Sequence, residues 1–285
     1  MSDRYTNTIK QKPMKLAVVN DMAGYGRCSM AVALPVISSC SVQACPIPTS
    51  IYSNHTAYPE HVVTDLAETL PSYLDMWKKQ AFTFDGLLCG FLNSHFQMEA
   101  ISDFIQYLRP QGSLIVIDPV MGDHGKRYRM VSPTFSDHMK QFIKHASLLT
   151  PNLTEACILT DTDYKESPWS EQELCSIAEK LNRMGPENIV ITGIKNQESL
   201  VNFIFESNTG HSLHQVTHIG NGRHGTGDIF SAIVSSLILR NFTLKDAVKI
   251  ASDFIVTILE ASNAFQIPVI EGVMFEPFLG MLTKL

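Results

Sequence analysis

The 285-residue chain lacks the features that mark several large classes of protein. No apolar run approaches the roughly 20 residues needed to cross a bilayer, so we expect no membrane segment. Basic residues are not in excess, and the formal net charge of −6 argues against a general binder of nucleic acid or anionic membranes. The polar start of the chain has no apolar signal core, which favours a cytoplasmic protein over a secreted one.

The chain also lacks two common site signatures. Its six cysteines include no Cys-x-x-Cys pair and match no common zinc spacing, so we expect reduced thiols rather than disulfides or a zinc site. Cys28 is either a reactive thiol or an inert one, and nothing in its neighbourhood indicates a depressed pKa. No Gly-x-x-x-x-Gly-Lys-Ser/Thr loop occurs, so a bound phosphate would need a different cradle.

What the chain does contain is an alternation of strand-like and helix-like segments. Short buried strands are expected at 16–19, 42–47, 86–89, 114–117 and 189–192, and helices at 62–77, 98–108 and 174–184. This order predicts an α/β fold with a mostly parallel central sheet and helices on both faces. Residues 200–206 and 212–218 predict a hairpin that forms an antiparallel edge. We expect a polar N-terminal extension, 1–14, followed by a single domain, 15–285.

Gly225-Thr226-Gly227-Asp228 is the most informative stretch. Apolar residues follow it at helical spacing, and their stripe is centred opposite Asp228, so the carboxylate should face a cleft. The glycines allow a close approach of the backbone to a ligand, and the first N–H groups of the helix can receive an anion. An acidic residue in a first helical turn also complements the helix dipole, so a purely structural role is the alternative.

Asp118 to Asp123 places two acids around a proline- and glycine-containing turn at the end of an expected strand. This pattern indicates either a metal–phosphate site, because Mg²⁺ prefers oxygen ligands and needs only one or two carboxylates, or an ordinary acidic turn. Lys126, Arg127 and Arg129 follow it, and they either cover a polyphosphate or form a solvated basic loop.

Thr150 to Glu155 has the pattern of a helix start, in which Thr150 or Asn152 caps the helix and Glu155 completes a capping box. Asn152 and Glu155 should also lie near Asp118, where they could share a network of metal and water. Asn20, Asp21, the segment 54–56 and Thr192 follow other expected strands. Because ligands bind beyond the carboxyl ends of parallel strands, one crevice should gather these residues.

Taken together, these residues resemble the vitamin B6 (pyridoxal) kinase branch of the ribokinase-like superfamily, from about residue 15 onward. Four segments carry the resemblance: Ser53-Asn54-His55-Thr56-Ala57-Tyr58, with Ala57 in place of the usual glycine; Asp118 to Asp123; Thr150 to Glu155; and Gly225 to Asp228. The last is typical of the whole superfamily, whereas the first is more specific to B6 kinases. Asp21 to Ser29 is similar to the start of bacterial pyridoxamine kinases.

The resemblance implies a three-layer ribokinase-like sandwich, a homodimer, and Mg²⁺-assisted phosphorylation of the 5′-hydroxymethyl group of a B6 vitamer by ATP. It gives Asp228 the role of general base and Gly225, Thr226 and Gly227 that of the anion hole. The nucleotide side comprises Asp118, Lys126, Thr150, Asn152, Glu155 and Thr192, with Asp118 and Glu155 organising the metal. The acceptor side comprises Asn20, Asp21, Thr56 and Phe91, where Phe91 replaces the family's usual tyrosine.

Two alternatives remain open at this point. A hydroxymethylpyrimidine kinase shares the reaction and much of the site, and one chain does not reveal the preferred ring. A non-catalytic vitamin- or nucleotide-binding protein belongs to another class, but binding alone does not require a base beside an anion hole.

Overall fold

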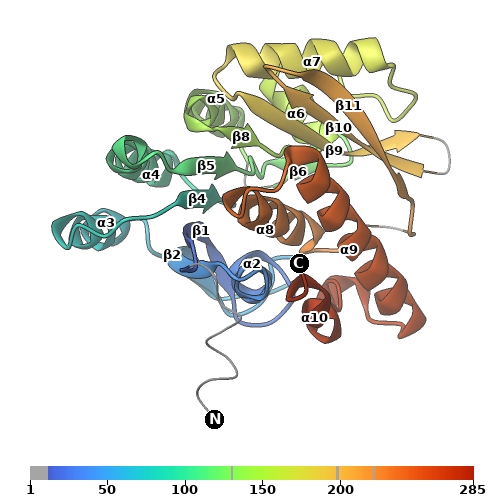
Figure 1. The fold of residues 1–285 in the computed structure, drawn as a ribbon. Coiled ribbons are helices and arrows are strands. Elements are labelled where there is room, and N and C mark those ends of the chain that lie inside the picture. The colour runs from blue at the N-terminus through green and yellow to red at the C-terminus, as the bar shows by residue number, and fades with distance from the viewer. Residues whose placement is uncertain (1–11, 130, 197–198, 221) are drawn as a thin grey trace.

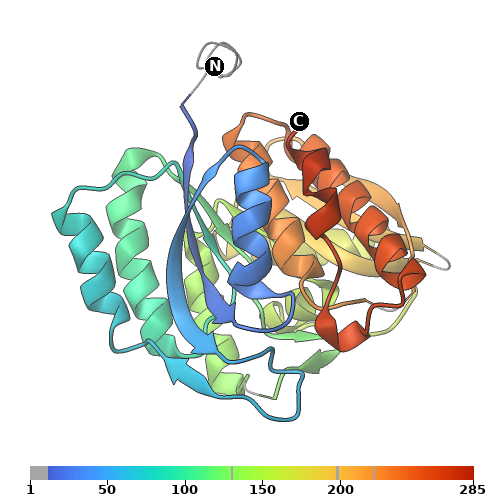
Figure 2. The same cartoon turned by 90° about the horizontal axis from the view of Figure 1, so that it is seen from below.

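The computed structural model describes residues 12–285 except 130, 197–198 and 221. Within these residues, nine strands form one sheet in the order β11-β10-β9-β8-β5-β4-β1-β2-β3 (Figures 1 and 2). The strands are β1 (Lys15–Ala23), β2 (Gln43–Tyr52), β3 (Val63–Asp65), β4 (Gly86–Cys89), β5 (Leu114–Ile117), β8 (Leu148–Leu149), β9 (Asn188–Asn196), β10 (Ser199–Glu206) and β11 (Gly210–Thr217). A separate small ribbon pairs β6 (Gly122–Asp123) with β7 (Lys126–Arg127).

The six strands from β9 to β2 in this order run parallel, and both edges are antiparallel. The expected hairpin is confirmed, because β10 pairs with β11 and Leu200 lies opposite Val216. The other edge was not expected: β3 pairs antiparallel with β2. The β1–β2 register shifts between Asn20 and Met22, where β2 contains one extra residue.

Helices cover both faces of the sheet (Figure 1). One face carries α2 (Ser29–Ser39), α8 (Thr226–Leu239), α9 (Leu244–Ala264) and α10 (Leu279–Leu282); the other carries α3 (Leu70–Lys79), α4 (His95–Leu108), α5 (Pro133–Phe142), α6 (Leu153–Leu159) and α7 (Glu171–Arg183). Short 3₁₀ helices occupy Arg109–Gln111, Ile143–His145, Val269–Glu271 and Glu276–Phe278.

Side-chain alternation along the strands explains the two layers of core. In β1, Leu16 and Val18 pack toward α2 and α8, whereas Ala17 and Val19 pack toward α3 and α4. Successive side chains of a strand point to opposite faces, so a strand buried on both sides is apolar throughout. The predicted α/β fold with a mostly parallel sheet is therefore confirmed.

The helix predicted over 62–77 is wrong at its start. Residues 63–65 form β3, and Val63 lies opposite Tyr52 of β2, so the extended backbone gains hydrogen bonds from a neighbouring strand. The helix begins at Leu70, with Pro71 in its first turn. Proline suits that position but disfavours helix in the residue before it, so Pro71 was the signal for the true start.

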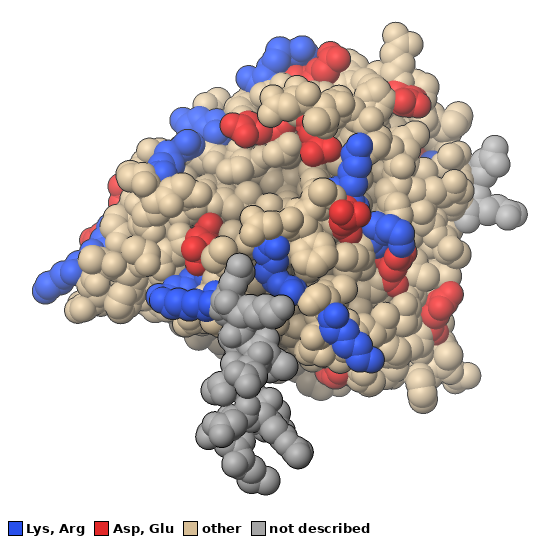
Figure 3. Space-filling view, in the orientation of Figure 1, with Lys and Arg blue, Asp and Glu red and all other residues tan. Residues whose placement is uncertain are grey.

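Charges of both signs are mixed on one face of the molecule. On the face shown in Figure 3, basic and acidic side chains of the described residues are interspersed and form no extended basic patch. None of the helices in the described part of the chain has the length and apolar character needed to cross a membrane.

Phe104 of α4 provides a test of the core. It is fully buried, and its ring lies edge-on to Trp77 and Phe84, with centroids 6.0 and 5.9 Å away. We predict that Phe104→Ala lowers the free energy of unfolding by about 3–5 kcal/mol, because it removes buried apolar surface and leaves a cavity. Phe96→Ala on the same helix, where the side chain is exposed, should change it by less than about 1 kcal/mol. Urea denaturation of both variants measures the difference, and equal losses would contradict this account of the core.

Candidate active site

Polar residues gather at the carboxyl ends of three adjacent parallel strands. Asn20 and Asp21 lie near the end of β1, Gly90 and Phe91 follow β4, and Asp118 follows β5. The first turn of α8 reaches the same place, because Asn20 and Asp118 both contact residues of that helix. The site therefore lies where an α/β sheet usually binds its ligand.

Asp228 is held by two neutral donors. The Nδ2 group of Asn20 donates to Oδ1 of Asp228 at 3.0 Å, and the backbone N–H of Ser29, the first residue of α2, donates to Oδ2 at 2.8 Å. Burial raises the pKa of Asp228, while these two hydrogen bonds act in the opposite direction. The carboxylate is thus fixed in orientation without a cationic partner.

Asn20 is itself fixed by the backbone. Its Oδ1 atom accepts the N–H groups of Asp21 and Phe91, each at 3.0 Å, which leaves Nδ2 directed at Asp228. Gly90 makes room for this amide, because a Cβ atom there would lie 2.5 Å from Nδ2 of Asn20. In the protein alone, Asn20 therefore orients Asp228; its predicted contact with the acceptor ring stays a prediction.

Asp118 lies deep beside α8 and is only 8% exposed. Ser231 Oγ lies 2.9 Å from Asp118 Oδ2 and 3.0 Å from Thr150 Oγ1. Because the Ser231 hydroxyl donates to Asp118, its own oxygen can accept from Thr150. Thr150 is buried and belongs to this hydrogen-bond network. Its predicted contact with a nucleotide phosphate stays a prediction.

Glu155 forms the capping box of α6 with Asn152. The backbone N–H of Asn152 donates to Glu155 Oε2 at 2.8 Å, and Asn152 Oδ1 accepts the N–H of Glu155 at 3.0 Å. The other carboxylate oxygen of Glu155 accepts the N–H of Met121 at 3.0 Å, and Asn152 Nδ2 donates to the carbonyl of Gly122. Asn152, rather than Thr150, is the cap. The pair ties the acidic turn after β5 to the start of α6.

Four carboxyl groups share this small region, and their charges repel one another. Burial, followed by the charge of Asp228, raises the pKa of Asp118 to about 7. Burial also raises the pKa of Asp21 to about 6, and burial and the charge of Asp118 raise that of Glu155 well above its usual range. Among the ion pairs of the described residues, none involves these four groups. The cluster is therefore suited to a cation.

A magnesium ion fits the chemistry of these donors. No group of three or more His, Cys, Asp or Glu side chains in the described residues could hold a metal by itself. Mg²⁺ does not need such a cage, because one or two carboxylates, phosphate oxygens and water complete its shell. Asp118 is the better ligand candidate, since both oxygens of Glu155 already accept backbone N–H groups.

The start of α8 has the geometry of an anion site. Gly225 has φ of 87°, and a Cβ atom there would lie 2.3 Å from the carbonyl oxygen of Arg27, so only glycine fits. At Gly227, an added Cβ would meet only Asp118 Oδ2, at 3.9 Å. The first N–H groups of a helix have no acceptor within it, so they are open to an anion beside Asp118.

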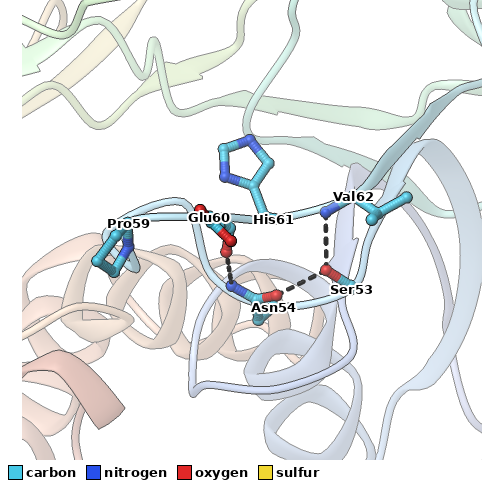
Figure 4. Close-up of a pocket in the computed structure, with 6 residues that line it drawn as sticks. All are labelled: Ser53, Asn54, Pro59, Glu60, His61 and Val62. Atoms are coloured by element: carbon cyan, nitrogen blue, oxygen red, sulfur yellow. Dashed lines mark hydrogen bonds between the residues drawn. The ribbon is translucent and has the colours of Figure 1, made fainter.

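The loop between β2 and β3 uses two of its polar residues to hold itself together (Figure 4). Ser53 Oγ accepts the N–H of Val62 at 2.9 Å and donates to Asn54 Oδ1 at 2.6 Å, while Asn54 Nδ2 donates to the carbonyl of Glu60 at 2.9 Å. These residues line an open hollow of about 550 Å³. Ser53 and Asn54 therefore shape the loop.

The same loop reaches the segment that precedes α8, because His55 lies beside His224. The rings of His55 and His224 lie 4.2 Å apart, and burial, with a contribution from His224, lowers the pKa of His55 to about 4. Thr56, next to His55, is exposed. Its contact with an acceptor stays a prediction.

The remaining nucleotide-side residues surround the acidic turn. Lys126 is exposed on β7, opposite Asp123 of β6. Thr192 bridges to Asn152, and its backbone N–H donates to the carbonyl of Pro151 at 2.9 Å. Their contacts with ATP stay predictions.

Cys28 lies beside this cluster and is buried. Burial, together with the charges of Asp228 and Asp21, raises the pKa of its thiol, so it stays protonated and the inert interpretation is favoured. The six cysteines are all free.

The sequence profile of the phosphomethylpyrimidine kinases matches residues 32–272, which is most of the chain. The chain belongs to the phosphomethylpyrimidine kinase family. A Bacteroides thetaiotaomicron protein assigned to these kinases, in a crystal form with pyridoxal, is 32% identical with a TM-score of 0.91, covering 95% of this chain and 96% of its own. Pyridoxal kinase from Lactobacillus plantarum is 26% identical with a TM-score of 0.87, covering 95% and 97%. The resemblance to ribokinase-like B6 kinases is thereby confirmed.

Two curated relatives of the chain are longer than the chain itself. The chloroplastic thiamine biosynthetic bifunctional enzyme of Arabidopsis thaliana is 24% identical over 97% of this chain, which spans 52% of that enzyme. A Schizosaccharomyces pombe protein assigned as a pyridoxal kinase is 30% identical over 66% of this chain and 57% of its own length. The chain thus spans about half the length of each.

Several residues of the site escaped the sequence analysis. Ser231 had a usable signal, because it lies three residues after Asp228 and so on the same side of α8. Gly90 had a weaker one, as an isolated glycine at the end of a strand. The N–H of Ser29 had none, because any residue at that position supplies it.

The charge cluster predicts how stability depends on pH. Asp118 has a pKa of about 7 in the folded protein and 3.8 as its ordinary value, so between these values the folded state holds a proton that the unfolded state has lost. The contribution of Asp118 to stability without ligands should therefore fall as pH rises from about 4 to 7 and stay low above it, whereas the lowered pKa of His55 acts in the opposite direction.

Asp118→Asn should remove much of this fall. The free energy of unfolding of the variant minus that of the parent should therefore be about 1–3 kcal/mol larger at pH 8 than at pH 5. Asp253→Asn, at an exposed carboxylate paired with Lys249, is the matched control and should leave the slope unchanged. Thermal melts across this range, without metal or nucleotide, measure both; a parallel curve for Asp118→Asn would contradict the prediction.

Proposed function

We propose that the chain transfers a phosphoryl group from ATP to the 5′-hydroxymethyl group of a B6 vitamer: pyridoxal, pyridoxine or pyridoxamine. The observation that carries this proposal is the placement of Asp228. A carboxylate oriented by Asn20 and by the N–H of Ser29 lies at the start of α8, directly after the glycines of the anion site. A general base beside a phosphate cradle is what an alcohol kinase requires.

Asp228 would accept the proton of the acceptor hydroxyl as that oxygen attacks the γ-phosphorus. Burial raises its pKa above that of an exposed aspartate, which makes the carboxylate a stronger base. Asn20 and the N–H of Ser29 limit rotation of the carboxylate. Its approach to the hydroxyl is thus set before the substrate binds.

The N–H groups of Thr226 and Gly227 would receive the charge that develops on the transferred phosphoryl group. Asp118, beside Gly227, would hold Mg²⁺, with Glu155 supporting the turn behind it. When bound there, Mg²⁺ supplies positive charge that neutralises the phosphate oxygens. Without a cation, Asp118 would repel the same phosphate.

The B6 vitamer is favoured by the Ser53 to Tyr58 segment and by the 32% identical structure whose crystal form contains pyridoxal. Hydroxymethylpyrimidine is the second candidate, favoured by the family to which the chain belongs. Both acceptors carry a hydroxymethyl group on an aromatic ring. The homodimer, the use of Mg²⁺ and the cytoplasmic location stay predictions.

Asp228→Asn tests the base. We predict a loss of turnover of about 10²–10⁴-fold with a preserved fold and preserved ATP binding, because proton transfer is removed but the anion site is not. Asp246→Asn is the matched control, since Asp246 is also an acid in a first helical turn, that of α9. Steady-state kinetics, circular dichroism and calorimetry with ATP compare the two. Equal, small effects would show that Asp228 only complements the helix dipole.

A panel of acceptors tests the substrate. The purified chain, given ATP and Mg²⁺, should phosphorylate at least one of pyridoxal, pyridoxine and pyridoxamine with higher kcat/KM than hydroxymethylpyrimidine, as measured by mass spectrometry of the products. Turnover of the pyrimidine alone would establish the second candidate. Binding without any phosphorylated product would identify a binding protein and refute the proposal.

A further inference from the structure

Arg223, two residues before Gly225, is almost completely buried, with 8% of its surface exposed. Its Nη1 donates to the carbonyls of Ile267 and Gly272, at 2.8 and 3.4 Å, and its Nη2 donates to Asn263 Oδ1 at 3.1 Å. No ion pair of the described residues includes it. A buried guanidinium is normally paired with a carboxylate, so this arrangement requires an explanation.

The guanidinium joins two segments that are distant in sequence. All three of its acceptors belong to residues 263–272, which run from the last turn of α9 to the residue after the 3₁₀ helix Val269–Glu271. The carbonyl of Arg223 accepts the hydroxyl of Thr226 at 3.0 Å, within the anion site itself. A Cβ atom at Gly272 would lie 3.1 Å from the carbonyl oxygen of His224, so the two segments also touch through their backbones.

A third segment, the turn before α2, also contacts the residues around Gly225 and Gly272. The carbonyl oxygen of Arg27 lies where a Cβ atom on Gly225 or Gly272 would collide with it, at 2.3 and 2.7 Å. The anion-hole segment is therefore clamped between residue 27 and residues 263–272. Its conformation, with Gly225 in the left-handed region, depends on that clamp.

We propose that Arg223 is a positioning residue for phosphoryl transfer: its buried charge binds the 263–272 segment and fixes the N–H groups of the anion hole toward the phosphate. This rests on the proposed kinase function. The acceptors of the guanidinium are neutral oxygens of Ile267, Gly272 and Asn263, so none of them cancels its charge. A carboxylate partner would have held the segment equally well but cancelled the charge.

Arg240 provides a matched control on the same helix. It is the C-cap of α8, at the opposite end, and its guanidinium likewise donates to main-chain oxygens, those of Cys40 at 3.3 Å and of the last residue, Leu285, at 2.8 Å. Arg223→Met and Arg240→Met remove the same group and the same kind of hydrogen bond. Only the first lies at the anion site.

We expect Arg223→Met to lower kcat/KM for ATP by ~10-fold or more, with a smaller change in KM for the acceptor, because a support of the anion hole is removed. Guanidinium chloride at non-denaturing concentrations should restore part of this loss, and Arg223→Lys should be intermediate. Arg240→Met should keep kcat and KM whatever its change in Tm. Equal kinetic effects in the two Met variants, or no rescue, would reduce Arg223 to a structural residue.

Two further outcomes are separable. If the parent protein phosphorylates no acceptor, the proposed function fails, but calorimetry with Mg²⁺–ATP still decides this inference, since only Arg223→Met should bind ATP more weakly. If Arg223→Met does not fold, the same comparison is made with Arg223→Lys, in which one donor group replaces the planar fork. Unchanged ATP affinity in a folded variant would overturn the inference.

Discussion

Four carboxyl groups gather at the carboxyl edge of this sheet, where burial and, to a lesser degree, their mutual repulsion disfavour the charged forms. Asp21, Asp118, Glu155 and Asp228 come from four different parts of the chain, and each has a raised pKa because of burial, with neighbouring charges adding to the effect for Asp21, Asp118 and Glu155. Folding brings them together at a cost, because like charges in a poorly solvated place destabilise one another. The cost would fall if a divalent cation and a phosphate occupied the site, as the proposed function requires. In the proposed kinase, affinity for the cation and instability without it would thus have the same physical origin.

Neutral donors, rather than lysine or arginine, hold these acids in place. Asp228 accepts an amide and a backbone N–H, Glu155 accepts two backbone N–H groups, and Asp118 accepts a serine hydroxyl. A cationic side chain would fix them as well, but it would lower their pKa and compete with the metal. The one buried guanidinium discussed above faces carbonyls instead. The acids of the site therefore keep their negative charge available for the cation that we propose there.

The fold was predictable because a strand buried on both faces has to be apolar, and the runs at 86–89 and 114–117 coincide with β4 and β5. The strand β8 escaped, since two residues carry no periodicity, and β3 was mistaken for helix because its partner lies in another segment. The acids of the site could be read from their turns and spacing. The donors that orient them could not, because a backbone N–H leaves no trace in composition and Asn20 gains its role only when Gly90 and Phe91 are folded beside it.

The extra residue in β2 has a consequence for the loop that follows. Because of it, the consecutive residues Thr49 and Ser50 are both buried, and their side chains bond to Phe91 and Asn93. After it the alternation changes phase: Ile51 is exposed and Tyr52 is buried. Deleting one residue at this point would bury position 51, expose position 52 and turn the whole 53–62 loop about the strand axis. The direction of the loop is therefore determined by a residue count upstream, whereas its internal shape depends on the hydrogen bonds of Ser53 and Asn54.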